Sequence, residues 1–175
     1  MKSYVKTACI AILFTNDLKH IHLHSAGEDF DKIHNLAEEY YDKMAEESDY
    51  LCELAIENGE PMVNPTRALE VVEEWQPEDE ENYDYNHCLS AVNTKLTLYL
   101  RALTTLRHEE EQLDIQSKLD DIVRDWKKEL EYKMAKRSQF ATTSFVKSDV
   151  DDRTTEYAKQ YMSQQQKGDG LLPWD

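Results

Sequence analysis

One uninterrupted segment, residues 29–58, constrains the fold more than any other part of this 175-residue chain. It contains neither glycine nor proline over 30 residues, and Asn58-Gly59 then provides a typical helix stop. A single helix of that length would extend about 45 Å, at a rise of about 1.5 Å per residue. Such a helix is too long for a compact α/β domain and favours a helical bundle.

Three further segments have the apolar spacing of long amphipathic helices, namely residues 4–24, 82–106 and 113–137. The connection before residue 82 is long, and we expect a short helix inside it, because Asn64-Pro65 supplies an N-cap and a first-turn proline. A long crossover with a small helix is typical of ferritin-like bundles rather than of simple up-down-up-down bundles. The predicted fold is therefore an all-α, ferritin-like four-helix bundle.

The character of the sequence changes after residue 137. Residues 138–152 are rich in serine and threonine, residues 153–165 are compatible with a short helix, and the final segment contains glycine and proline. We therefore expect two parts: a bundle over residues 1–137 and a C-terminal extension over residues 138–175 that is partly helical or flexible.

The charge balance limits the possible partners. The chain has 36 acidic and 20 basic side chains, a formal net charge of -16. Unaided binding of nucleic acid or of an anionic membrane is not expected, because both are polyanions. The balance instead favours cations or basic partners.

The chain shows no sign of export or membrane insertion. The apolar run over residues 8–14 is only seven residues long and is followed by polar residues without a small-residue cleavage site. The three cysteines are far apart and form no C-x-x-C motif, which indicates reduced, mostly buried thiols. We expect a cytoplasmic protein with no membrane partner.

A strip of potential metal ligands lies on the long segment over residues 29–58. At about 100° per residue, His34, Glu38, Asp49 and Glu53 share about one quarter of the helix surface. Imidazole nitrogen combined with carboxylate oxygen suits iron, manganese or zinc better than calcium. The alternative is a solvated acidic face, because residues 28–60 contain 12 acidic side chains.

The spacing of these side chains resembles the Dps-type mini-ferritins (DNA-binding proteins from starved cells). In that family a histidine ends the first helix, a second histidine follows, and then come a carboxylate and a D-x-x-x-E pair. The matching residues here, in the same register, are His22, His34, Glu38, Asp49 and Glu53. The resemblance covers about residues 8–137. Outside the ligands it includes Phe14-Thr15, Gly27, Phe30, residues 54–61 and residues 119–126.

The resemblance implies a hollow shell of twelve subunits with a ferroxidase site at each two-fold interface. There, His22 and His34 of one chain would face Glu38, Asp49 and Glu53 of its neighbour, or share the set in a similar partition. The site would oxidise Fe(II) with peroxide or oxygen and pass ferric iron to mineral inside the shell, protecting against oxidative damage.

The same resemblance implies a role for each ligand. Asp49 and Glu53 would be the main anionic ligands, with Glu53 able to bridge two irons. His34 and Glu38 would complete or orient a weaker second site, and His22 would tune affinity across the interface. The implied catalytic residues are therefore Asp49, Glu53, His22 and His34.

The sequence departs from the family pattern at several positions. Leu23 stands where an aromatic residue is usual, His24 competes with His22 as the first-helix ligand, and Glu38 replaces the more usual aspartate. Lys2 and Lys6 are the only basic residues near the N-terminus, and the extension is net acidic, so we expect no DNA binding without bridging cations.

Three other functions are compatible with motifs in the sequence. One is a non-catalytic ferritin-like bundle that serves assembly or partner binding. Another is an all-α nucleotide pyrophosphohydrolase of the MazG type, although no cluster of basic residues is evident to hold phosphate. A third is a larger di-iron carboxylate protein. The motif behind the pyrophosphohydrolase alternative is Glu38-Glu39-x-x-Asp42 with Asp121 and Asp125. The motifs behind the di-iron alternative are Asp31-x-x-His34 and Asp84-x-x-His87.

Overall fold

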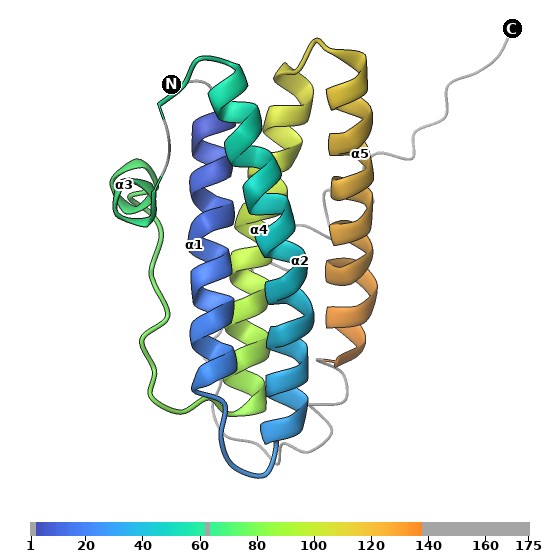
Figure 1. Ribbon diagram of the computed structural model, residues 1–175. Helices are drawn as coiled ribbons and strands as arrows, with labels where there is room; N and C mark the ends of the chain where they lie inside the picture. The colour runs from blue at the N-terminus through green and yellow to red at the C-terminus, as the bar shows by residue number, and fades with distance from the viewer. Residues whose placement is uncertain (1–2, 62–63, 138–175) are drawn as a thin grey trace, which may run out of the picture. The chain divides into compact units, whose positions relative to one another are not determined.

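The computed structural model describes residues 3–61 and 64–137, and in these ranges the chain is helical without any β-strand (Figure 1). The elements are α1 Ser3–Leu23, α2 Phe30–Glu57, α3 Pro65–Val71, α4 Tyr85–Glu109, α5 Leu113–Lys128 and the π-helical segment η1 Glu129–Met134. The predicted all-α class is confirmed. The extension predicted over residues 138–175 lies outside the described residues.

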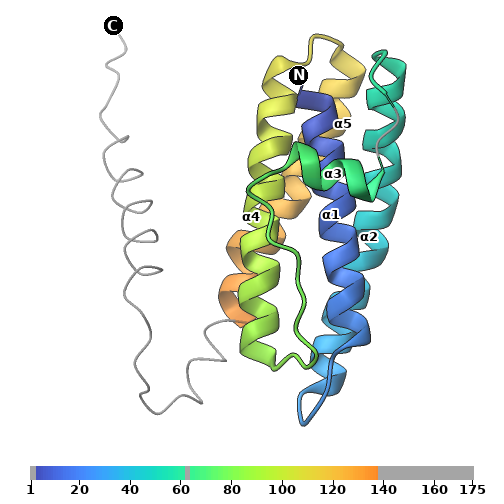
Figure 2. The same ribbon diagram turned by 90° about the vertical axis from the view of Figure 1, so that its left-hand side faces the viewer.

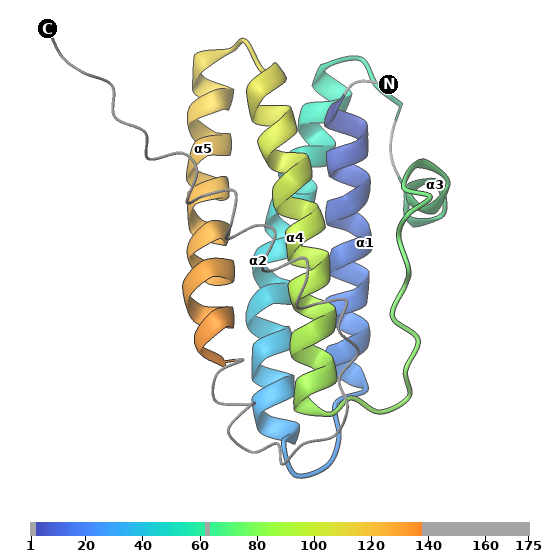
Figure 3. The same ribbon diagram turned by 180° about the vertical axis from the view of Figure 1, so that it is seen from behind.

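Helices α1, α2, α4 and α5 form the bundle, and α3 lies outside it against α1 (Figure 2). α1 and α2 are one antiparallel pair, and α4 and α5 are the other (Figure 3). The connection that contains α3 runs along the bundle, so α4 starts at the end where α2 started. α2 and α4 are therefore parallel, which is the long-crossover connectivity predicted for a ferritin-like bundle.

Local sequence signals end α2 and begin α3 as predicted. Gly59 follows α2 with φ of 78°, and the Glu60 amide donates a hydrogen bond to the Ala55 carbonyl, a Schellman-type end. Asn64 then caps α3, and Pro65 occupies its first turn.

The start of α4 differs from the prediction. The helix begins at Tyr85 rather than at Asn82, because the Asp84 carboxylate accepts a hydrogen bond from the His87 amide at 2.8 Å and acts as the N-cap. Asp84 is therefore a helix cap, and the Asp84-x-x-His87 motif has a structural explanation.

The last helix is also less regular than predicted, because it widens into η1 after Lys128. In this segment Glu129 accepts a hydrogen bond from the Tyr40 hydroxyl at 3.0 Å, and Lys133 lies 3.5 Å from Glu39. These polar contacts anchor the end of the bundle's last helix on α2.

One carboxylate of α2, the half-buried Glu47, faces the core and not the surface strip. The Oε2 atom of Glu47 accepts hydrogen bonds from the Tyr99 hydroxyl at 2.8 Å and from Trp126 Nε1 at 2.6 Å. Burial raises the pKa of Glu47, and these two hydrogen bonds oppose that shift. Tyr99 and Trp126 are themselves fully buried, so Glu47 satisfies the polar atoms of the aromatic core.

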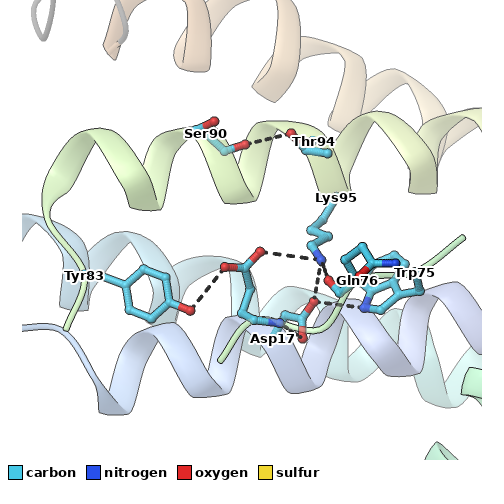
Figure 4. A network of polar contacts seen from close by, with 8 residues as sticks. Asp17, Trp75, Gln76, Tyr83, Ser90, Thr94 and Lys95 are labelled. Atoms are coloured by element: carbon cyan, nitrogen blue, oxygen red, sulfur yellow. Dashed lines mark hydrogen bonds and ion pairs between the residues drawn. The ribbon is translucent and has the colours of Figure 1, made fainter. Parts of the chain in front are cut away.

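A buried ion pair fixes the long connection against the bundle (Figure 4). Asp17 of α1 lies 3.1 Å from Lys95 of α4, with side-chain exposures of 6% and 5%. Trp75 of the connection donates to Asp17 at 3.0 Å, and Lys95 Nζ donates to the Gln76 carbonyl. Lys95 also lies 3.5 Å from Glu78. Three parts of the chain are thus held at one buried charge cluster.

The prediction for the cysteines is confirmed. Cys9, Cys52 and Cys88 are free thiols, and Cys9 and Cys88 are buried. Burial raises the pKa of Cys9 to about 11 and that of Cys88 to about 12, which keeps both thiols protonated.

As for the membrane, none of the helices in the described ranges combines the length and the apolar character needed to span one.

Candidate metal centre

Two predicted ligands, His22 at the end of α1 and His34 near the start of α2, lie against each other. Their rings stack with centroids 3.9 Å apart. His22 Nδ1 lies 3.4 Å from the His34 carbonyl oxygen, and His34 Nδ1 lies 3.2 Å from the His22 carbonyl oxygen. We call this reciprocal arrangement the histidine clasp.

The clasp selects one tautomer for both rings. A carbonyl oxygen only accepts hydrogen bonds, so each Nδ1 carries the proton and donates it. The lone pair of each neutral ring is then on Nε2, which is the atom available to a metal. Histidine ligands commonly donate their second ring N–H to a carbonyl in this way, and such a contact orients the ring and increases its basicity. The clasp therefore has the chemistry expected of a metal-binding histidine pair.

Ser25, in the turn between α1 and α2, supports the clasp. Its hydroxyl donates to the His22 carbonyl at 2.9 Å and lies 3.5 Å from His34 Nδ1. The residue is buried at 8% exposure. Sequence reasoning missed Ser25, because only its place between two histidines that meet in space distinguishes it from other turn serines.

Phe30 stacks on the other side of His34, with ring centroids 4.9 Å apart. Leu23, which stands where the family resemblance implies an aromatic residue, is 67% exposed. Phe30 instead provides an aromatic ring at the candidate site, from the first turn of α2.

His24, the competing first-helix candidate, is directed elsewhere. Its ring stacks on His20 at 4.2 Å, and its Nδ1 lies 3.3 Å from the Glu81 carbonyl oxygen in the long connection. His20 in turn lies 3.0 Å from the Glu80 carbonyl oxygen. These contacts favour His22 over His24 as the partner of His34.

The structure does not bring all five candidates together in one chain. Glu38 follows His34 by one helical turn, whereas Asp49 and Glu53 lie about 22 Å and about 28 Å further along α2 at about 1.5 Å per residue. Ligand atoms must lie about 2 Å from a bound transition metal. Within the described part of the chain, no group of three or more His, Cys, Asp or Glu side chains is placed to hold a metal ion.

The three carboxylates are nevertheless accessible. Glu38, Asp49 and Glu53 are exposed, and none of them forms an ion pair within the described residues. Their neighbour Glu39 differs, because Lys133 and Arg137 lie 3.5 Å and 3.7 Å from it. The candidate ligands therefore form two separate half-sites along α2: the clasp with Glu38, to which α1 contributes His22, and the pair Asp49 and Glu53.

Comparison with known proteins places the fold. No family model and no curated protein matches the sequence. The solved structure of antigen TpF1 from Treponema pallidum matches with a TM-score of 0.67 and 20% identity, over 77% of this chain and 90% of that chain. Helicobacter cinaedi CAIP matches with a TM-score of 0.65 and 19% identity, over 78% and 95%. Dps from Staphylococcus aureus matches with a TM-score of 0.54 and 18% identity, over 83% and 94%.

These matches define the chain first as a ferritin-like four-helix bundle. Its fold is, more particularly, that of the solved Dps structures, so the predicted ferritin-like fold is confirmed.

Proposed function

We propose that this protein is an oligomeric mini-ferritin that oxidises Fe(II) at a site shared between two subunits and stores the ferric product. The observation that carries the proposal is the histidine clasp, which packs His22 of α1 on His34 near the start of α2, while Asp49 and Glu53 lie on the His34 face of α2 toward its other end. Neither half-site alone has the ligands for two irons, and each has what the other lacks.

A second copy completes the site when the two α2 helices pair antiparallel. The clasp of one chain then faces Asp49 and Glu53 of the other, and two-fold symmetry produces two equivalent sites. Glu38 lies one turn from His34 and about 16 Å from Asp49, so it belongs to the histidine half-site. The proposed site therefore combines His22, His34 and Glu38 of one subunit with Asp49 and Glu53 of its neighbour.

The chemistry needs little beyond these ligands. Anionic Asp49 and Glu53 favour Fe(III) over Fe(II), which assists loss of one electron from each iron. Two Fe(II) ions deliver two electrons to one hydrogen peroxide molecule, which takes up two protons and leaves as two water molecules. Oxygen is the alternative oxidant.

The charge of the chain suits this substrate. Residues 28–60 carry 12 acidic side chains and only two lysines, so much of the net charge of -16 lies on the turn and helix that hold the proposed ligands. This field attracts cations and disfavours DNA unless cations bridge the two surfaces.

Peroxide-driven iron oxidation tests the proposal. The protein, loaded anaerobically with Fe(II) and then mixed with peroxide, should develop ferric absorbance rapidly. His22→Ala should weaken Fe(II) binding and slow oxidation by about tenfold to a hundredfold, whereas the matched variant His24→Ala should behave as the parent. A protein that assembles but oxidises iron no faster than buffer would support the non-catalytic alternative instead.

Particle mass tests the assembly independently. The shell requires a particle of about twelve times the subunit mass of 20.6 kDa. A particle close to 20.6 kDa on light scattering would contradict both the shell and the shared site.

A further inference from the structure

Two large apolar side chains of α2 are exposed, although apolar residues of that size are usually buried. Phe30 is 43% exposed and Ile56 is 51% exposed. They lie at opposite ends of α2, and each is within about 40° of His34 around the helix axis. Both therefore border the face that carries the proposed ligands.

The positions of these two residues match the register that the metal site requires. Phe30 precedes His34 by four residues, and Ile56 follows the midpoint of Asp49 and Glu53 by five residues. Suppose that two α2 helices pair antiparallel with His34 of one opposite this midpoint of the other. Phe30 then faces a position of the second helix that is one residue from Ile56, an offset of about 1.5 Å along the axis. The apolar pair and the ligand sets thus independently define the same alignment.

From this coincidence we propose that Phe30 of one subunit packs on Ile56 of the second copy, closing the outer end of each shared metal site with an apolar contact. The proposal rests on the proposed function, because it uses the same two-fold pairing of α2. It adds the residues that determine the register.

An apolar contact is needed here because the rest of the face opposes self-association. Glu38, Asp42 and Asp49 would bring like charges together between the two helices. Burying Phe30 against Ile56 at both ends of the helix pair contributes an attraction that does not depend on bound cations. Phe30 already contacts the His34 ring, so the same contact excludes water from one side of the ligand.

Disulfide trapping in the full-length chain tests the contact. All variants carry Cys52→Ser, because Cys52 is the partly exposed native thiol. Phe30→Cys combined with Ile56→Cys should give a covalent dimer under mild oxidation on non-reducing gels. The matched control combines Phe30→Cys with Leu113→Cys; Leu113 is 80% exposed but lies on α5, so this control should stay largely uncrosslinked.

The outcomes separate this proposal from the function on which it rests. Absence of the dimer in a variant that still oxidises iron would overturn the Phe30–Ile56 contact and leave the shared site standing. A dimer in a protein without iron oxidation would support the contact and contradict the function. In case the cysteine variants misfold, the exchange Phe30→Ile with Ile56→Phe should keep the parental assembly, whereas the double alanine variant should weaken it about tenfold or more.

Discussion

Replacing Lys95 by methionine is expected to lower the free energy of unfolding by about 3–5 kcal/mol. The substitution keeps the unbranched shape and most of the length of the side chain but leaves Asp17 and Glu78 next to each other without their cation. It also removes the hydrogen bond to the Gln76 carbonyl, which fixes the long connection. Thermal or chemical unfolding should show the loss, with the melting temperature falling by roughly 10 °C.

A matched control is available on the same connection. Lys6 of α1 forms an ion pair with Glu74 at 2.8 Å, but the two side chains are 46% and 51% exposed. Lys6→Met should therefore cost less than about 1 kcal/mol. Equal stability of Lys6→Met and Lys95→Met would show that the buried ion pair does not hold the connection.

The loss caused by Lys95→Met should depend on pH. Burial raises the pKa of Asp17 in the folded chain, and Lys95 opposes that shift. Without Lys95 the folded pKa rises further, so the folded variant binds more protons than the unfolded chain. Stability of the variant therefore increases as pH falls. The difference from the parent should be largest near neutral pH and should shrink as pH falls toward about 4, the ordinary pKa of an aspartate.

The four long helices and the crossover could be predicted because their signals are local. Apolar spacing marks each buried face, and Asn58-Gly59 and Asn64-Pro65 end one helix and start the next. The buried charges could not be predicted in this way. Glu47 stands among many exposed acids of α2, and only its hydrogen bonds to Tyr99 of α4 and Trp126 of α5, more than 50 residues away, distinguish it from them.

For the candidate site, too, local sequence patterns predicted some features, whereas others depended on the three-dimensional structure. His22 and His34 were predicted together because their spacing resembles that of the mini-ferritin ligands, and in the structure they meet across the short turn between α1 and α2. The tautomer of the rings depends on the exact geometry of that turn, so the reciprocal hydrogen bonds and the role of Ser25 needed the structure. Asp49 and Glu53 complete no metal site within the described part of their own chain, so their place opposite the clasp is a proposal that rests on the resemblance and on the two-fold pairing of α2.

Removing both carboxylates of one half-site should abolish rapid iron oxidation. Asp49→Ala with Glu53→Ala deletes the main anionic ligands, and we expect the rate to fall at least about a hundredfold. Both side chains are exposed and form no ion pair in the described part of the chain, so folding and stability should change little. Stopped-flow ferric absorbance after peroxide addition measures the rate, and circular dichroism verifies the fold. An unchanged rate would show that these carboxylates are not the site.

Mixing two inactive variants shows whether the site is shared. His34→Ala lacks the histidine half-site, and Asp49→Ala with Glu53→Ala lacks the carboxylate half-site. When the two variants assemble together in equal amounts, half of the two-fold pairs contain one chain of each variant. Each of these mixed pairs has one intact site and one site that lacks both half-sites. The mixture should therefore regain about a quarter of the parental activity. If one chain supplied all the ligands, every site would carry a defect, and the mixture could not exceed the average of the two variants.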